Sequence, residues 1–507
     1  MPDSTNARVT QETLDLIKGL LANGSLAKAT TFGITQATGL VNFDLEPRAK
    51  YLFPVITPIR NSIPRAKGQG DTATHYRTIV AINPSRQTPG VSEGNRGSVI
   101  DQTEVDRIAT YKGLGLENSL TEEAMYAAEG FDDALRIMGD ILLYAVMIAE
   151  EEIILQGNNS LQLGTPVAPT GVGSATGGTM AANATNACQV VALTYDGWKR
   201  ATVATGVVTT FNKSNADGTT DSAIGGGSSA ASLISGVIVT AGATSSITWS
   251  ATAVKGAVAY AWYTGTGAQG TLALNGITTI NQFVQTAVAA GTQLASVVNA
   301  DNSTNRLVFD GLITQTQFTP PAGASGYSSN TYGYWTSLNG AFLTGNSDGS
   351  ITEIDNALQL FWETFRVTPT KIRVNAQEAR NITKKVFASG TTAAFQVKVA
   401  SGADQAGLTG ASFVGAYYNK FAPGGPVALP IEVHPNLPPG QIFFDCESIP
   451  YPLANIPGPR RIKARREFYQ TLWPQTTRTR FTGVYVDELL QVYTPFALGV
   501  ISNIGNG

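Results

Sequence analysis

The sequence contains few residues of the kinds that build catalytic or metal sites. Its 507 residues include two cysteines, Cys188 and Cys446, and two histidines, His75 and His434. Two distant cysteines cannot make a disulfide framework or a cysteine-based zinc site, so free buried thiols are expected. With so little histidine, metal binding and triad chemistry are disfavoured, and structural roles are expected for both histidines.

Charged residues are also scarce, at 14 % of the chain, and 34 Lys and Arg against 37 Asp and Glu give a net charge of −3. A protein that holds nucleic acid over its whole surface should be far more basic. No basic segment followed by an apolar run begins the chain, so no signal peptide is expected. The longest apolar run, Ile141–Ala149, is about half the length that crosses a bilayer. We therefore expect a soluble protein made inside the cell, without a membrane partner.

Familiar cofactor and catalytic motifs are absent, including G-x-x-x-x-G-K-[ST], G-x-S-x-G and H-E-x-x-H. The run Gly265–Gly270 fits G-x-G-x-x-G, but β-like sequence follows it instead of the helix that would hold a pyrophosphate, so a hairpin turn is favoured. Glu150, Glu151 and Glu152 are consecutive and would point in different directions on a helix. A solvated or interface-facing helix end is expected there. We predict no enzyme, no cofactor and no metal.

Composition divides the chain into three zones. Residues 159–347 contain ten charged residues in 189 and no glutamate, whereas the other 318 residues contain 61, which is 71 minus 10. Short strand-like runs separated by Gly and Ser turns fill this middle zone, which predicts an all-β sandwich with a core at about 165–320. The abrupt change at both ends indicates an inserted domain.

The first zone begins with an arm and a ribbon. Residues 1–61 form an N-terminal arm with an amphipathic helix at 11–21, and such an arm must pack on something else. Residues 62–113 form an extended loop, a ribbon of two strands at Thr72–Ile82 and Val99–Tyr111. An isolated two-stranded hairpin is marginal in water, so this ribbon needs a second surface.

A long helix is predicted at Phe131–Leu155, within a segment 114–158 that ends at Gly157 and Asn158. Apolar side chains recur along it in steps of three and four, and a second stripe predicts burial on more than one face. The members of this second stripe are Ile137, Ile141, Tyr144 and Ile148.

Ordinary charged composition returns at 348–507. Helices are predicted at Ile351–Phe365 and Ala376–Phe387, with a short strand at Lys371–Val374 between them. Short strands and Pro- and Gly-rich turns follow. The first and third zones therefore form two halves of one α+β unit, which the sandwich interrupts.

One cluster of basic residues stands out near the end of the chain: Arg460, Arg461, Lys463, Arg465, Arg466, Arg478 and Arg480. The favoured interpretation is a solvated strand face or a set of intersubunit ion pairs. The alternative is a patch that faces the phosphate backbone of DNA. Phe468, Tyr469 and Trp473 lie nearby and are expected to be packing residues rather than base-stacking ones.

The order of arm, ribbon, long helix and later α+β half resembles the major capsid protein of tailed bacteriophages, the HK-ninety-seven-like fold. Ala145–Asn158 (AVMIAEEEIILQGN) is similar to the end of that family's spine helix, and Ile431–Ile449 (IEVHPNLPPGQIFFDCESI) to a late strand–turn–strand passage. Leu489–Asn503 resembles the closing strand. The resemblance covers about 1–158 and 348–507. Within the insertion, Ser246–Tyr263 (SITWSATAVKGAVAYAWY) resembles an immunoglobulin or fibronectin type III domain.

The resemblance implies a virion protein whose peripheral and axial domains are split between the first and third zones. It implies assembly into hexamers and pentamers of an icosahedral head around packaged double-stranded DNA, with non-specific contact to that DNA. It implies a separate scaffolding protein and a portal as partners, and decoration proteins as further candidates. Some family members cross-link a loop lysine, but Lys67 and Lys112 do not lie at the ribbon tip, so that chemistry is not transferred. The alternative is a phage tail or surface adhesin that binds host-cell glycans through the sandwich.

Overall fold

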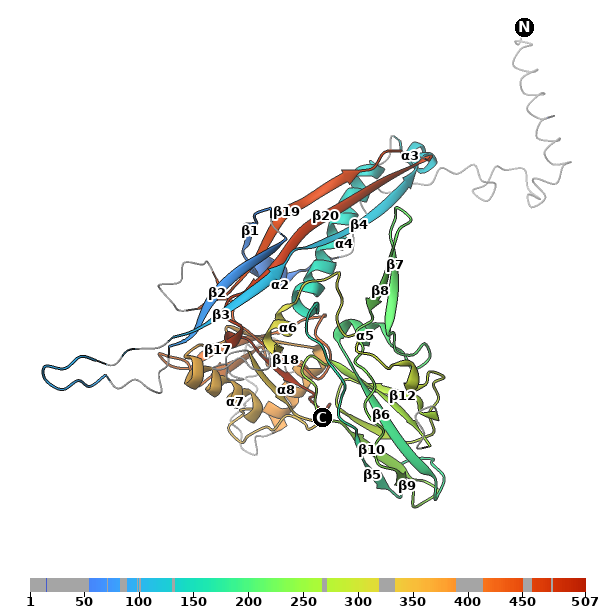
Figure 1. Cartoon of the computed structure of the whole chain (residues 1–507), viewed down its shortest axis with the longest axis vertical. Helices are drawn as coiled ribbons and strands as arrows, with labels where there is room; N and C mark the ends of the chain where they lie inside the picture. The colour runs from blue at the N-terminus through green and yellow to red at the C-terminus, as the bar shows by residue number, and fades with distance from the viewer. Residues whose placement is uncertain are drawn as a thin grey trace, which may run out of the picture. The chain divides into compact units, whose positions relative to one another are not determined.

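The computed structural model describes residue 15 and the ranges 54–70, 72–82, 89–97, 99, 102–129, 133–266, 271–318, 333–388, 414–449, 458–475 and 477–507. The predicted helix at 11–21, apart from residue 15, and nearly all of the predicted arm lie outside these ranges. The chain divides into two units, and the larger one comprises Val55–Ala127 and Asp133–Gly507. It is α+β, as predicted (Figure 1).

A four-stranded sheet and one long helix build the first part of this unit. The sheet has the order β1-β19-β20-β4. Its strands are β1 Arg65–Lys67, β19 Arg460–Leu472, β20 Thr479–Val492 and β4 Lys112–Thr121. The helix α4, Ala134–Gln156, packs on one face of the sheet through a shared apolar core. The short helices α2, Pro58–Ser62, and α3, Glu122–Ala128, flank this region.

The long helix confirms the predicted spine, with one correction. Asp133 caps α4, because its carboxylate accepts the N–H of Arg136 at 3.2 Å, and such a cap satisfies an otherwise orphaned donor. The stripe that contains Met138, Leu142 and Val146 is buried, as expected. The second stripe is not: Ile141 is 48 % exposed and Tyr144 43 %. Burial on more than one face was therefore the wrong prediction for this chain taken alone.

A six-stranded sheet holds the other half, in the order β14-β21-β18-β15-β17-β16. Its strands are β14 Tyr334–Ser337, β21 Gly499–Ser502, β18 Ile442–Asp445, β15 Lys371–Val374, β17 Val427–Val433 and β16 Ala416–Asn419. The helices are α7 Thr352–Leu360, continued by the π-helical turn η6 Phe361–Phe365, and α8 Ala376–Ala388. These bounds confirm the predicted helix–strand–helix order.

One predicted strand is two. The closing segment Leu489–Asn503 begins in β20 of the four-stranded sheet and ends in β21 of the six-stranded sheet. The 3₁₀ turn η7, Pro495–Ala497, separates them. Proline lacks the N–H that a continuous central strand would need, so the chain changes sheets at this point.

The predicted ribbon is present. β2, Ala73–Ile82, and β3, Gln102–Thr110, pair antiparallel and form a sheet of two strands (Figure 1). Its root contacts the body through Tyr76, whose hydroxyl donates to the carbonyl of Val492 at 3.4 Å and whose ring meets Tyr493 edge to face at 5.3 Å.

The middle zone forms two facing sheets, β13-β10-β5 and β12-β11-β6-β9, with Trp249 and Trp262 buried in their common core. In an immunoglobulin sandwich the first two strands pair in one sheet. Here β5 pairs with β10, while β6 lies in the other sheet. The sandwich is confirmed, but its strand order differs from the immunoglobulin order. The elements are β5 Thr170–Ser174, β6 Thr185–Leu193, α5 Tyr195–Arg200, β7 Thr210–Ser214, β8 Thr220–Gly225, β9 Ile238–Val239, β10 Ser246–Ser250, β11 Ala259–Gly265, β12 Ala273–Thr278, β13 Gln282–Gln285 and η4 Ala295–Val297.

The two ends of the insertion are hydrogen-bonded to each other. The N–H of Asn305 donates to the carbonyl of Asn158 at 2.8 Å, and that of Gly311 donates to Gly157 at 2.8 Å. Helix α6, Leu312–Gln317, and strand β14 fall inside the predicted insertion, 159–347, yet α6 joins the core beneath α4 and β14 pairs with β21. We therefore place the end of the insertion before α6. Within the predicted arm, 1–61, Ile59 belongs to the same core.

No helix among the described residues is long and apolar enough to span a membrane.

Candidate functional site

The basic residues singled out in the sequence lie on one hairpin, because β19 and β20 are antiparallel neighbours. Arg465, Arg466 and Arg480 are exposed, and Arg461 and Lys463 are half-buried. Arg478 directly precedes β20 and forms an exposed ion pair with Glu123 at 2.7 Å. Exposed pairs of this kind contribute about 0–1 kcal/mol. Whether the exposed members face DNA stays a prediction.

Arg460 does not belong to any exposed patch. Its side chain is 2 % exposed, forms an ion pair with the buried Asp445, and donates to the hydroxyl of Ser62 at 2.8 Å. A buried guanidinium needs such partners because its desolvation is costly. The structure therefore removes this residue from the predicted basic patch.

The exposed face of the hairpin carries a row of flat side chains. The Arg466 guanidinium lies 3.5 Å above the centroid of the Tyr469 ring, which stacks on Tyr485 at 5.8 Å. The Tyr485 hydroxyl donates to Glu117, and burial together with this bond raises the pKa of Tyr485. Gly115 leaves room for the ring, since a Cβ there would lie 2.1 Å from Cδ1 of Tyr485. The row joins β19, β20 and β4.

Trp473 ends this row and is not a packing residue. It is 46 % exposed, and its indole N–H donates to Glu117 at 3.0 Å. Phe468, by contrast, packs against the core, as expected, with Arg60 and Arg65 over its ring.

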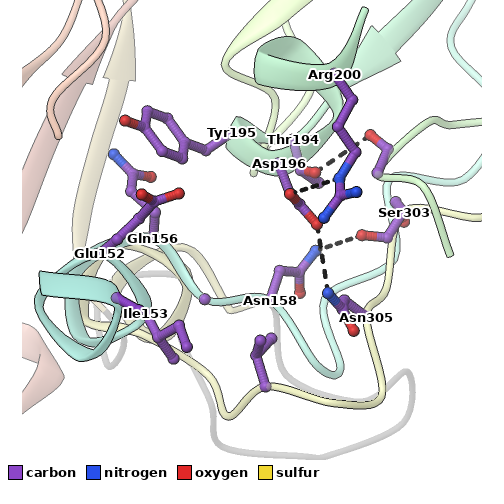
Figure 2. Close-up of a pocket in the computed structure, with 14 residues that line it drawn as sticks. Glu152, Ile153, Gln156, Asn158, Thr194, Tyr195, Asp196, Arg200, Ser303 and Asn305 are labelled. Carbon is purple, nitrogen blue, oxygen red and sulfur yellow. Dashed lines mark hydrogen bonds and ion pairs between the residues drawn. The ribbon is translucent and has the colours of Figure 1, made fainter. Parts of the chain in front are cut away.

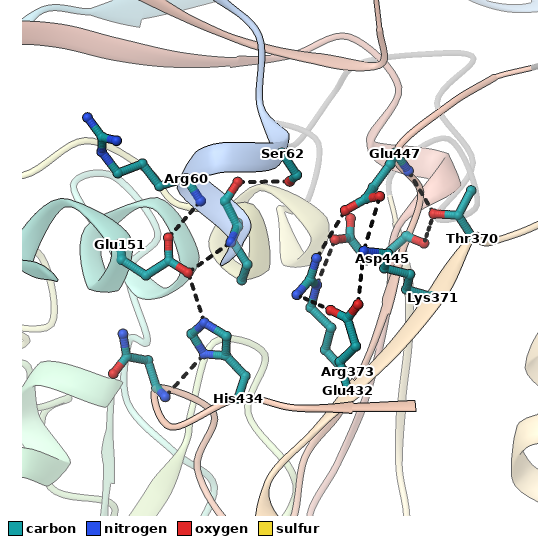
Figure 3. A network of polar contacts seen from close by, with 12 residues as sticks. Arg60, Ser62, Glu151, Thr370, Lys371, Arg373, Glu432, His434, Asp445 and Glu447 are labelled. Atoms are coloured by element: carbon teal, nitrogen blue, oxygen red, sulfur yellow. Dashed lines mark hydrogen bonds and ion pairs between the residues drawn. The ribbon is translucent and has the colours of Figure 1, made fainter. Parts of the chain in front are cut away.

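The acidic end of α4, Glu150–Glu152, differs from the prediction, because two of its three glutamates are buried. Glu151 is buried, and its carboxylate accepts the backbone N–H groups of Ile59 at 2.9 Å and Arg60 at 2.6 Å (Figure 3). Nε2 of His434 lies 2.9 Å from the same carboxylate. Nδ1 of His434 accepts the N–H of Asn436, so the ring proton is assigned to Nε2, which donates to Glu151. A solvated helix end was therefore wrong for this residue.

Glu150, also fully buried, binds the same incoming segment. It accepts Nε of Arg60 at 2.6 Å and forms a second ion pair with Arg65. Arg65 also contacts the buried Glu488 at 3.0 Å. Burial raises the pKa of Glu488, and the nearby guanidinium of Arg65 opposes that rise. Because the carboxylates of Glu150 and Glu488 are both paired with arginines of the segment that precedes the ribbon, α4 and β20 are held to that segment.

A second network joins the two sheets, and Figure 3 shows the part of it around Arg373. Arg373 of β15 is buried and contacts Asp445 at 2.9 Å, Glu432 at 2.7 Å and Glu447 at 3.1 Å. Asp445 also holds Arg460 of β19, so one carboxylate connects the six-stranded sheet to the four-stranded sheet. We call the two networks together the buried joint. Its members are Arg60, Arg65, Glu150, Glu151, Arg373, Glu432, His434, Asp445, Glu447, Arg460 and Glu488.

A cavity of about 240 Å³ lies where α4 meets the insertion (Figure 2). Its polar wall is internally bonded: Arg200 pairs with Asp196 at 2.9 Å, and Asn305 donates to Asp196 at 3.3 Å. Glu152 lines it as well and forms an ion pair with Lys199 of α5 at 2.8 Å. This arrangement connects the insertion to the helix end and brings no reactive group together.

The remaining predicted residues do not converge. His75 is exposed on β2, far in the chain from the buried His434. Gly265 ends β11, which pairs antiparallel with β12, and residues 267–270 of the glycine-rich run lie outside the described residues. Among the described residues, no group of three or more His, Cys, Asp or Glu side chains is placed to hold a metal ion.

No protein-family model and no curated protein sequence matches the chain. Among solved structures, it is similar to the capsid of a native GTA particle, with 7 % identity over 94 % of this chain and 100 % of that chain and a TM-score of 0.42. It is similar to the capsid of Myoviridae phage XM1, with 8 % identity, the same coverage and a TM-score of 0.38. It is also similar to the SrpI encapsulin of Synechococcus elongatus PCC 7942, with 8 % identity over 94 % and 96 % of the chains and a TM-score of 0.38.

Proposed function

We propose that this chain is a shell-forming subunit, the major capsid protein of a phage head. The observation that carries the proposal is the ribbon formed by β2 and β3. At about 3.3 Å per residue, its ten-residue strand extends for roughly 33 Å. Two strands alone are marginal in water, and the described contacts with the body lie at the root. A neighbouring copy would supply the missing surface.

Side chains on the ribbon support this. Ile108 of β3 is exposed, although it is a large apolar residue. Arg77 of β2 is held in an ion-pair cluster with Glu104 at 3.2 Å and Asp106 at 2.6 Å on the opposite strand. The two ribbon strands are thus held together by ion pairs, and a neighbouring copy would cover Ile108 on assembly.

The long helix offers a second unpartnered surface. Ile141 and Tyr144 of α4 are half-exposed on the side away from the apolar core. A stripe of such residues on a helix is usually covered. We infer that assembly covers it.

The buried joint suits a structural role, because it connects α4, the root of the ribbon and the two sheets. Arg60 and Arg65 lie in the segment that leads directly into β2, and both are anchored to Glu150 at the end of α4. A ribbon that binds a neighbour transmits force through its root, and ion pairs with Glu150 and Glu488 hold that root to α4 and to the four-stranded sheet. A structural function therefore suits this network better than catalysis does.

The finer proposal follows the family resemblance. Copies would form hexamers and pentamers of a closed virion shell around double-stranded DNA, with a scaffolding protein and a portal as assembly partners. Exposed basic residues of the β19–β20 hairpin, such as Arg466, would make non-specific contact with the DNA. The sandwich would be an accessory module, to which decoration proteins are candidate partners.

The test is expression of the full chain, followed by light scattering and electron microscopy. We expect closed shells. Deleting the ribbon tip, residues 83–97, should leave circular dichroism unchanged and abolish shells. The matched control removes a different hairpin tip, residues 215–219 between β7 and β8, and should still assemble. A stable monomer with a protease-resistant ribbon would contradict the proposal.

A further inference from the structure

A serine repeat follows β8 in the insertion and runs along one edge of β6. Its three serines are buried and lie three residues apart in the sequence: Ser229, Ser232 and Ser235. Their backbone N–H groups donate to alternate carbonyls of β6 at 2.8 to 2.9 Å, and the acceptors in the same order are Ala192, Val190 and Cys188. The segment therefore runs antiparallel to β6, and we call residues 228–236 the serine strap.

The serine hydroxyls take the place that backbone carbonyls would have in a neighbouring strand. In an antiparallel ladder, two opposed residues exchange both of their N–H···O bonds. Here Oγ of Ser229 accepts the N–H of Ala192 at 2.8 Å, and the other two serines repeat this bond at 3.0 Å and 2.9 Å. Each hydroxyl in turn donates to the carbonyl of the residue after it, at 2.9 Å. Three residues of the strap thus cover two residues of β6.

The cover continues beyond both ends of the strap. Before it, the carbonyl of Gly227 accepts the N–H of Thr194 at 2.8 Å. After it, β9 pairs antiparallel with Thr185 and Asn186 of β6. The opposite edge of β6 pairs with β11. Both edges of β6 are therefore closed to a further strand.

The composition of β6 is that of a strand that pairs readily when its edge is bare. Its sequence, TNACQVVAL, has no charged residue and no proline. Uncharged segments of high β-propensity join strands of other chains, and natural sheet edges are protected by lysine, by proline or by a covering segment. Neither β6 nor the strap contains a charged residue. In this zone of low charge, a covering segment replaces protection by charge.

We propose that the serine strap is an edge guard, which blocks antiparallel pairing between β6 of one copy and β6 of a second copy. The excluded partner is a strand of the same sequence, because an antiparallel pair of identical edges is self-complementary. The guard depends on the three hydroxyls, since alanine in their place would leave three N–H groups of β6 without an acceptor. Such bare N–H groups at a sheet edge are a template for an incoming strand.

The test replaces all three hydroxyls in the full chain, with Ser229→Ala, Ser232→Ala and Ser235→Ala combined. Hydrogen exchange with mass spectrometry should show that β6 peptides gain up to three deuterons, one for each freed N–H. Peptides of β11 should stay protected, which reports that the sandwich is folded. Raising the protein concentration should slow the exchange of β6 again and increase thioflavin T fluorescence, because copies then pair.

Ser228 supplies a matched control at the neighbouring position. It is fully buried, and its hydroxyl has no hydrogen-bond partner among the described residues. Ser228→Ala should therefore change neither the exchange of β6 nor the association of the chain. If the triple variant unfolds, as lost protection in β11 would show, the three single variants replace it, and each should gain one deuteron in β6.

Two results would overturn the proposal. If β6 exchanges as slowly as in the unmodified protein even at the lowest concentration, the hydroxyls do not hold the edge closed. If β6 exchanges fast and a higher protein concentration does not slow it, the bare edge attracts no second copy. The exchange of β6 is measured whether or not shells form, so the result is independent of the proposed function.

Discussion

Replacing Glu151 by Gln tests the buried joint directly. One oxygen of the carboxylate accepts from Ile59 and His434, and the other accepts the N–H of Arg60. A glutamine keeps one acceptor oxygen, but its NH₂ group then faces the Arg60 N–H, and the negative charge is lost. An unsatisfied buried donor costs about 1–3 kcal/mol, and a hydrogen bond to a charged group contributes about 1.5–3 kcal/mol. We expect the free energy of unfolding to fall by about 3 kcal/mol.

The next residue supplies the matched control. Glu152→Gln makes the same change one position along α4, where the side chain is 31 % exposed and pairs with the exposed Lys199. Its cost should be about 0–1 kcal/mol. Urea denaturation of the unassembled subunit, followed by circular dichroism, measures both. If the two variants agree within about 0.5 kcal/mol, the reasoning about the buried joint is refuted.

Three further predictions concern packing, reactivity and the insertion. Gly115→Ala should lower the melting temperature, at a cost of about 1–3 kcal/mol, because its Cβ would overlap the Tyr485 ring. A Cβ at Gly70 meets no atom within 4 Å, so Gly70→Ala should leave the melting temperature unchanged. Equal melting temperatures of the two variants would contradict this reasoning. Burial raises the pKa of the Cys446 thiol to about 12, so the native protein should leave this residue unlabelled by iodoacetamide at pH 8, and rapid labelling would disprove its burial. Replacing 161–303 with a short glycine linker should preserve cooperative unfolding and shell formation, since hydrogen bonds already join the two ends; loss of cooperative unfolding would show that the insertion supports the body.

Elements with strong local patterns could be predicted from the sequence. The α4 helix, the strand Lys371–Val374 and the two ribbon strands each follow from periodicity and turn residues within a short window. The low charge of the middle zone likewise predicted a separate β-sandwich. Local patterns do not contain the pairing of distant strands, so the place of β5 beside β10 and of β14 beside β21 could not be predicted in the same way.

Only the tertiary structure decided which charged side chains are buried and which are exposed. Glu150 and Glu151 have the pattern of a solvated helix end, and Arg460 that of a basic surface strand. Their partners lie far away in the chain: Arg60 is 90 residues from Glu150, and His434 is 283 residues from Glu151. A charged side chain is stable in the interior when an opposite charge or hydrogen-bond donors lie beside it, and that depends on how the sheets meet. The sequence by itself determined which segments are helix, ribbon and sandwich; the folded chain determined which charged side chains are buried and which apolar side chains stay exposed.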